Sequence, residues 1–175
     1  MADILFVALI SRDTRPLYMQ MFDKGQKNES LDGDQPRSAE QTSGEATKEA
    51  LSHKENREAG SFLKYNFLAH MALEVFAAPL ALAAREVLAD GVVLLFVQDD
   101  VAVYGMETNN GLKIVVGMSD EIERTTLLRV FGRIHRSYTR TVCNPFSEVL
   151  GAQDCENMLQ TEKFDEKIRA AIRDV

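Results

Sequence analysis

The stretch SFLKYNFLAHMALEVFAA, residues 61–78, places apolar side chains over far more than one stripe of a helix. Projected at about 100° per residue, they cover a broad arc on one side. Beside this arc, Asn66, His70 and Glu74 stack at i, i+4 and i+8. The arc, which we expect to face the core, contains Phe62, Tyr65, Leu68, Ala69, Ala72, Leu73, Val75 and Phe76.

Beyond the polar stripe lies a second, narrower apolar strip made of Phe67, Met71 and Ala78. A helix with two apolar faces either sits between two layers of its own protein or binds a partner with one face. We hypothesise that Phe67, Met71 and Glu74, with His70 beside them, form a docking surface. The alternative is that a loop or the C-terminal segment of this chain covers Phe67 and Met71.

The ends of this helix are also predicted by the sequence. Ser61 is a suitable N-cap, and Pro79 discourages helical structure at Ala78. Residues 24–59, which precede the helix, are mostly charged or small and polar and contain no aromatic residue. Such a segment buries too little apolar surface to offset its ordering entropy. We therefore predict a disordered insert at 24–59 within a single domain that spans residues 1–175.

Composition excludes several classes of protein. The chain has 175 residues and a formal net charge of -7, which argues against a general nucleic-acid binder because phosphate binding needs a basic surface. Cys143 and Cys155 fit neither a redox pair nor a zinc spacing and indicate reduced thiols. The apolar run near the N-terminus is too short for a membrane span and lacks the basic flank of a secretory signal. These features predict a cytoplasmic protein.

Five short segments have the pattern of β-strands. The first is apolar on both faces, as expected of a strand buried on both sides, and the last three form a meander. Asp99-Asp100 and Asn109-Asn110-Gly111 supply its tight turns, since these residues tolerate positive φ. Together with the helices, the strands predict an α+β layered domain. The segments are Ile4–Ile10, Leu17–Phe22, Val92–Gln98, Val101–Thr108 and Leu112–Met118.

A second helix is predicted at about Glu121–Arg140, capped by Ser119 or Asp120, and a last one at about Thr161–Arg173, with a loop at 147–160 between them. The apolar side of the second helix contains Leu127, Leu128, Val130, Phe131, Ile134 and Tyr138. Its other side carries an arginine stripe of Arg129, Arg133, Arg136 and Arg140. We hypothesise that this stripe meets an acidic partner or an anionic membrane surface. The alternative is a solvated face, since exposed charges usually contribute little.

The sequence offers little that would support catalysis. Phosphate-binding glycine loops, a nucleophile elbow and zinc-binding histidine pairs are all absent. Cys143 could act as a nucleophile with His135, eight positions upstream, in a small-molecule hydrolase. The competing interpretation is that Cys143 is a small buried apolar residue and His135 a polar group on the core side of its helix. We therefore expect no enzyme activity, no cofactor and no metal.

Four segments resemble, in the right order, the sedlin-related small subunits of TRAPP, the transport protein particle, and among them the subunit 2-like branch. The most specific elements are VYG followed by TN in the meander, and HxSYT followed by CNPF after the second helix. The resemblance covers most of the chain apart from 24–59 and 147–160. The segments are RPLYMQMF (Arg15–Phe22), FLKYNFLAHMALEV (Phe62–Val75), VYGMETNNGLKIVV (Val103–Val116) and RIHRSYTRTVCNPF (Arg133–Phe146).

The resemblance implies a longin-like domain, a five-stranded antiparallel sheet with one helix on one face and two on the other. It also implies a non-catalytic assembly or adaptor subunit of a complex that tethers vesicles and promotes nucleotide exchange on Rab GTPases in ER–Golgi and Golgi traffic. Its partners would be other TRAPP subunits. It would meet a Rab GTPase only indirectly, and a membrane only peripherally, through the assembly.

In this family the first helix and an acidic residue on it contact neighbouring subunits. Glu74 is the matching position, where relatives commonly carry aspartate. The acidic residues that usually follow are replaced by Phe76, Ala77 and Ala78. A different reading is a standalone longin domain that regulates SNARE pairing. A vesicle SNARE of that kind would also carry a heptad helix and a membrane anchor.

Overall fold

The computed structural model describes residues 3–22, 46–78, 91–119, 122–145 and 152–173. Within these ranges, side chains are described from Ala59 onward in the second and from Glu156 onward in the last. Residues 24–45 of the predicted insert lie outside the described ranges.

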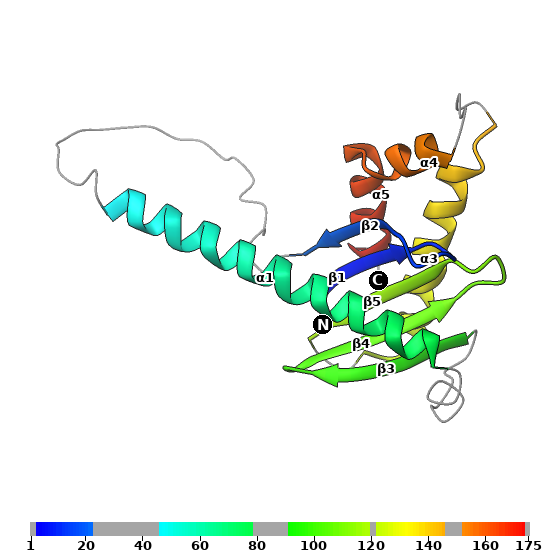
Figure 1. The fold of residues 1–175 in the computed structure, drawn as a ribbon, viewed down its shortest axis with the longest axis horizontal. Helices are drawn as coiled ribbons and strands as arrows, with labels where there is room; N and C mark the ends of the chain where they lie inside the picture. Colours follow the sequence, from blue (N-terminus) through cyan, green and yellow to red (C-terminus); the bar gives the residue numbers. More distant parts are fainter. Residues whose placement is uncertain (1–2, 23–45, 79–90, 120–121, 146–151, 174–175) are drawn as a thin grey trace.

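A five-stranded antiparallel sheet forms the centre of the molecule (Figure 1). Its strand order is β2-β1-β5-β4-β3, so the N-terminal hairpin joins the later meander through the pairing of β1 with β5. The predicted antiparallel five-stranded sheet is confirmed, and each predicted boundary is right to within one residue. The strands are β1 (Ile4–Ile10), β2 (Pro16–Met21), β3 (Val92–Gln98), β4 (Val101–Glu107) and β5 (Lys113–Met118).

Strand β1 is buried along its whole length because strands flank it on both sides and helices cover both faces of the sheet. Its side chains alternate between two hydrophobic clusters. Val7 and Leu9 belong to the cluster under helices α3 (Arg124–Val142) and α5 (Glu162–Arg173), whereas Phe6 and Ala8 belong to the cluster under helix α1 (Ala46–Ala77). This confirms the prediction of a strand buried on both faces.

The two predicted turns of the meander are confirmed. Asp99 and Asp100 both have positive φ, 50° and 61°, as a two-residue hairpin turn requires. In the second turn Gly111 has φ 85°, and its backbone N–H donates to the carbonyl oxygen of Thr108.

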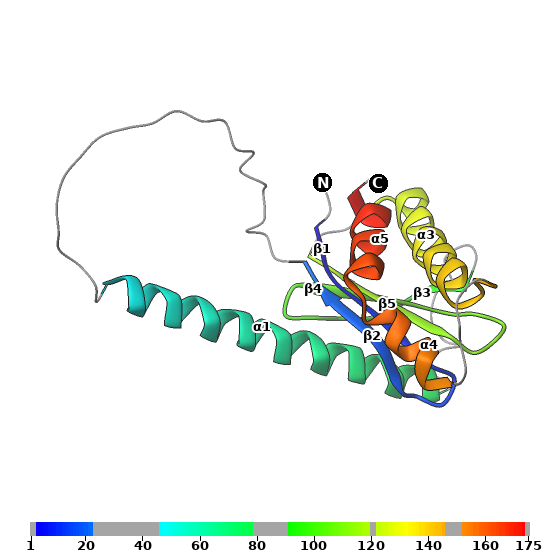
Figure 2. The same cartoon turned by 90° about the horizontal axis from the view of Figure 1, so that it is seen from above.

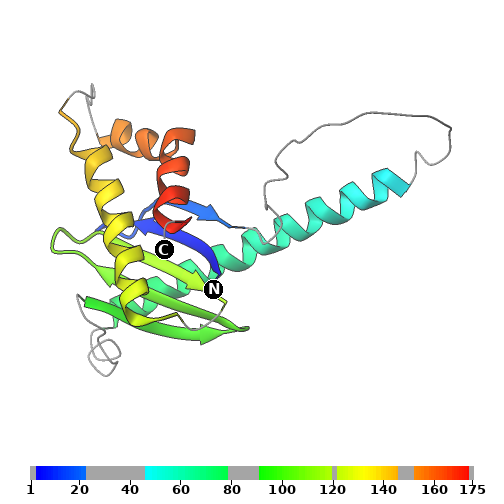
Figure 3. The same ribbon diagram turned by 180° about the vertical axis from the view of Figure 1, so that it is seen from behind.

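Helices cover both faces of the sheet (Figures 2 and 3). Helix α1 (Ala46–Ala77) lies on one face, and α3 (Arg124–Val142) and α5 (Glu162–Arg173) lie side by side on the other. The longin-like α+β arrangement is therefore as predicted, with one addition. A short helix, α4 (Ala152–Leu159), replaces most of the loop expected at 147–160 and buries Leu159 in the cluster beneath α3 and α5.

Helix α1 begins at Ala46, so the expected N-cap at Ser61 is wrong and Ser61 lies inside the helix. Residues 46–59 are helical, not part of a disordered insert. This segment is rich in alanine, glutamate and lysine, which favour helix without a large apolar face. The N-terminal half of α1 extends beyond the sheet (Figure 1). The predicted end before Pro79 is confirmed, because the helix stops at Ala77.

Helix α3 also begins later than expected. Its N-cap is Glu123, without a side-chain capping bond. Ser119 does not cap it, because it lies four residues before the N-cap. Its backbone N–H instead donates to the carbonyl oxygen of Asp3 and prolongs the pairing of β5 with β1. Asp120, the other expected cap, lies outside the described residues. The predicted core side is otherwise right: Leu127, Val130, Phe131 and Ile134 are buried, and Leu128 and Tyr138 are partly buried.

Candidate docking surface

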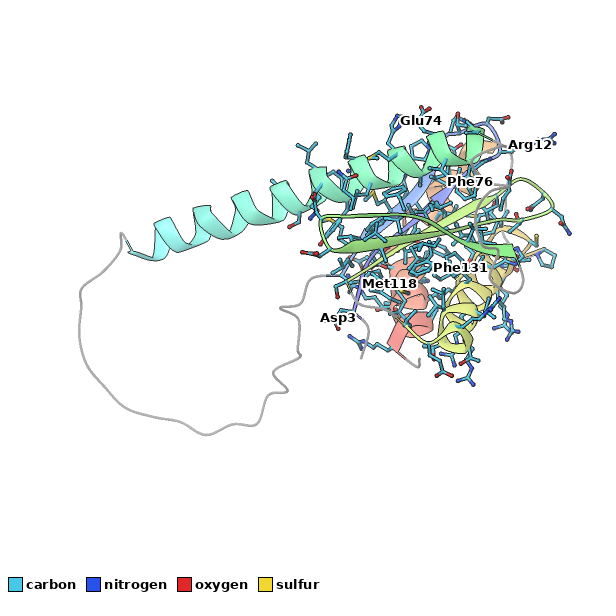
Figure 4. All side chains as sticks on the ribbon, turned by 90° about the horizontal axis from the view of Figure 1, so that it is seen from below. Asp3, Arg12, Glu74, Phe76, Met118 and Phe131 are labelled. Atoms are coloured by element: carbon cyan, nitrogen blue, oxygen red, sulfur yellow. The ribbon has the colours of Figure 1, made fainter. Side chains whose placement is uncertain are left out.

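The outer side of α1 carries large apolar side chains in contact with solvent. Phe67 is 57% exposed and Leu63 is 72% exposed, while Met71 is partly buried. His70 and Glu74 are exposed on the same side, and Figure 4 shows Glu74 pointing away from the sheet. We call Leu63, Phe67, His70, Met71 and Glu74 the outer α1 face.

The inner side of the same helix is closed against the sheet. Leu68, Ala72 and Phe76, at i, i+4 and i+8, are 1%, 0% and 9% exposed. Phe67 and Met71 each precede one of these residues by one position, a rotation of about 100° around the helix axis. The two apolar sides predicted for this helix therefore have different environments, one in the core and one at the surface.

Two side chains on α1, Leu63 and Phe62, differ from the expectation based on sequence. Phe62 was expected in the core but is 49% exposed. Leu63 was detectable in principle, since it precedes Phe67 by four residues and Met71 by eight and so extends their strip.

In addition to the apolar packing of its inner side, three contacts among the described residues join α1 to the sheet. The ring of Tyr65 stacks on Phe6 of β1 at a centroid distance of 5.3 Å and an interplanar angle of 25°. The ammonium of Lys64 lies 3.7 Å from a carboxylate oxygen of Asp99 in the β3–β4 turn. Near the other end of the helix, the Lys113 ammonium lies 6.0 Å from the centroid of the Phe76 ring. A helix held in this way presents its outer face in a fixed orientation.

The Lys113 side chain is an unusual component of this inner layer, because it is a charged group only 8% exposed. Its ammonium lies 3.3 Å from the Glu107 carboxylate, directly across the β4–β5 pair. Burial of a charge is costly unless it is paired, and this ion pair satisfies that requirement beneath the C-terminal end of α1.

The arginine stripe of α3 is divided by the structure. Arg129, Arg136 and Arg140 are exposed and Arg133 is partly buried. Arg133, Arg136 and Arg140 line a cavity between α3 and α5, but Arg129 does not. Lys167 of α5 joins them there, a residue that the sequence analysis did not single out because it lies on a different helix.

The residues considered for catalysis are not arranged for it. Cys143 is exposed just after α3, so the expectation of a buried cysteine is wrong. His135 is partly buried on the same helix, eight residues earlier and about 12 Å away along its axis. That separation is too large for direct proton transfer. Among the described residues, no three His, Cys, Asp or Glu side chains gather into a potential metal site.

No helix within the described ranges is long and apolar enough to cross a lipid bilayer. The antiparallel five-stranded sheet, with α1 on one face and α3 and α5 on the other, places the protein in the longin-like α+β class.

Comparison with known proteins identifies the family to which the chain belongs. The model of the sedlin family matches residues 9–174, and the chain belongs to this family. It is similar to the mouse protein named trafficking protein particle complex subunit 2-like protein, with 36% identity over 94 residues, 49% of this chain and 66% of that protein. The proteins of the same name from Bos taurus and Xenopus tropicalis are 36% and 32% identical, each over 48% of this chain and 65% of the relative. The matches thus span just under two thirds of the length of these relatives.

Proposed function

We propose that this chain is a non-catalytic subunit of a trafficking protein particle complex and that the outer α1 face docks onto a neighbouring subunit. Family membership and the names of the curated relatives support the complex. The complex would tether vesicles and promote nucleotide exchange on a Rab GTPase in ER–Golgi and Golgi traffic. This chain would contribute surface and not a catalytic group, remain cytoplasmic, and meet Golgi membranes peripherally through the assembly.

The observation that carries the proposal is the exposure of Leu63 and Phe67 on an ordered helix whose opposite side is buried. Neighbouring exposed apolar side chains favour an interaction site, whereas single scattered ones do not. Two large side chains one helical turn apart are the arrangement that a helix presents to an apolar groove. Glu74 lies on the same face, so the neighbouring subunit should offer an apolar groove with a cationic residue at its rim.

The test compares two tagged variants with the tagged wild-type chain in cells. One variant carries two substitutions and the other carries one. Leu63→Asp with Phe67→Asp places two charges in the proposed contact, and we expect the other TRAPP subunits to be lost from the purified material. Val97→Asp is the control, because Val97 is also an exposed apolar residue, 63% exposed, but belongs to strand β3 and not to α1. The control should retain the subunits. Thermal unfolding of the purified chains establishes that both variants are folded.

Recovery of the full set of subunits with the folded Leu63→Asp, Phe67→Asp variant would reject the docking surface. Loss of subunits with both variants would show that any exposed charge disturbs assembly, and it would equally reject an assignment to this face.

A further inference from the structure

Helices α3 and α5 lie on the face of the sheet opposite α1 (Figure 3). Residues of these two helices line a shallow cavity that is open to solvent. Its volume is about 330 Å³. Three arginines come from α3 and one lysine from α5, and small residues make up the remainder of the lining. The lining residues are Arg133, Arg136, Ser137, Arg140, Lys167, Ala170 and Ala171.

The local sequence explains why space remains between these two packed helices. Ala170 and Ala171 on α5 and Ser137 on α3 have short side chains, so the helices meet without filling the gap. Arg133, Arg136 and Arg140 are spaced at i, i+3 and i+7, which places them on one side of α3. The cavity is therefore formed by long cationic side chains around a lining of small ones.

Lys167 is oriented by a contact between the helices. Its ammonium donates to the hydroxyl oxygen of Thr141 on α3 at 3.1 Å, and Thr141 is only 7% exposed. One of the three ammonium hydrogens is used in this bond, so donors remain for a ligand. The bond directs a flexible side chain from α5 toward α3, where the arginines lie.

The charge of the cavity is opposite to that of the protein. Four cationic side chains contribute to it and none of its described lining residues is acidic, although the chain as a whole has a net charge of -7. Like charges one helical turn apart destabilise a helix. Such a concentration of positive charge in a concave site raises the local concentration of anions.

We propose that this cavity binds a phosphate-bearing anion of the size of a phosphorylated inositol, either as a free molecule or as the headgroup of a membrane lipid. Guanidinium groups bind phosphate through two parallel hydrogen bonds, and the exposed side chains of Arg136 and Arg140 line this cavity beside the partly buried Arg133. The volume is near the lower end of the range for small-molecule sites, which suits a headgroup. An extended acidic protein surface would also engage Arg129, which lies outside the cavity.

The site does not depend on the proposed docking surface. The cavity and the outer α1 face lie on opposite sides of the sheet (Figure 2), so an anion and a neighbouring subunit could be bound at the same time. Loss of one function by mutation should leave the other intact.

The test is a calorimetric titration of the full-length chain with inositol trisphosphate. Arg136→Gln with Arg140→Gln removes two charges from the cavity, and we expect affinity to fall by about tenfold or more, because hydrogen bonds between charged groups are lost. Arg129→Gln is the matched control on the same helix. It should change affinity by less than about twofold, as expected for a screened surface charge.

A second pair of variants protects the test against misfolding. Ala170 is exposed on α5 and lines the cavity, so Ala170→Glu introduces a carboxylate there and should abolish binding. Ala170→Gln introduces a side chain of nearly the same size without the charge, and this variant should retain most of the binding. Equal effects of these two variants, or equal effects of Arg129→Gln and the double arginine variant, would overturn the site.

Vesicles separate the two sources of the phosphate. Binding to phosphatidylcholine vesicles that contain a phosphatidylinositol monophosphate, lost in Ala170→Glu and absent with phosphatidylserine vesicles of equal surface charge, identifies a lipid headgroup. Binding of inositol trisphosphate without vesicle binding identifies a soluble ligand. Failure to bind any of these probes, or a preference for polyglutamate over inositol trisphosphate, would overturn the proposal.

Discussion

The ring of Phe6 on β1 lies so close to Gly117 on β5 that a Cβ at position 117 would come within 2.1 Å of its Cε1 atom. Phe6 is fully buried and stacks on Tyr65 of α1. The Phe6 ring can therefore occupy this position only because residue 117 has no side chain. Phe6 in turn packs against α1 through Tyr65. Gly105 has the same role toward Phe76, whose Cζ atom lies 2.7 Å from the position of a Cβ.

Gly117→Ala should destabilise the protein by about 1–3 kcal/mol, because an added methyl group overpacks a closed core. The backbone of Gly117 has no positive φ, so the loss would arise from the collision with Phe6. Urea unfolding provides the measurement. An unchanged unfolding midpoint would contradict the described packing of Phe6.

Gly132→Ala is the matched substitution where space is available. Nothing lies within 4 Å of a Cβ at Gly132, which is inside helix α3. We expect the free energy of unfolding to rise by about 0.5–1 kcal/mol, since alanine loses less conformational freedom than glycine on forming a helix. The same urea titration measures it, and a loss of stability at this position would contradict the structure of α3.

Tyr18 of β2 connects the sheet to α5. Its hydroxyl lies 2.7 Å from Asp165 Oδ1 and 2.7 Å from Gln20 Oε1, and its ring packs edge-on against Phe164. Gln20 Nε2 has no hydrogen-bond partner among the described residues. Because a carboxylate only accepts, the single tyrosine proton should serve Asp165, and an inverted Gln20 amide would then donate to the tyrosine oxygen.

Alkaline pH should weaken this connection. Burial raises the pKa of Tyr18 above its ordinary value of 10.0, and the hydrogen bond to Asp165 and the negative charge of Asp165 raise it further. The folded state thus keeps a proton that the unfolded state loses above about pH 10, so the free energy of unfolding falls as pH rises beyond that point. Tyr18→Phe should remove the contribution of Tyr18 to this alkaline decrease. At neutral pH the same variant should lower the free energy of unfolding by about 1 kcal/mol. Identical alkaline slopes for the two proteins would contradict the assignment.

Asp100 offers a stabilising substitution. It has φ 61° in the β3–β4 turn, a conformation that aspartate tolerates but that glycine adopts more readily. Asp100→Gly should therefore raise the unfolding midpoint. Gly111→Ala is the opposite case: Gly111 has φ 85° and a Cβ would lie 2.8 Å from Arg12 Cγ, so that variant should be less stable than the wild type.

The sheet could be predicted almost completely because its signals are local. The apolar run at 4–10, the paired aspartates at 99–100 and the glycine at 111 each determine nearby backbone structure. The N-terminal half of α1 was missed because composition was taken to indicate disorder, whereas the intrinsic helix propensity of residues 46–59 acts without an apolar stripe. Helix α4 was missed because eight residues give a weak periodic signal.

For the candidate surfaces, the sequence predicted which residues share one face of a single helix. It did not predict which residues of different helices lie together. The strip containing Phe67 and Met71 follows from helical spacing, and the same spacing extends it to Leu63, which is 72% exposed. The arginine stripe follows in the same way from the sequence of α3. The cavity does not, because Lys167 joins the arginines only through the packing of α5 against α3.

Site-specific crosslinking in the native assembly is the most direct measurement of the central claim. A photoreactive amino acid at position 67 of the tagged full-length chain should crosslink to another TRAPP subunit. The same group at Thr125, an exposed position on α3 across the sheet, should give no such product. Crosslinks from position 67 only within the chain itself, or equal crosslinking from both positions, would contradict a docking role for the outer α1 face.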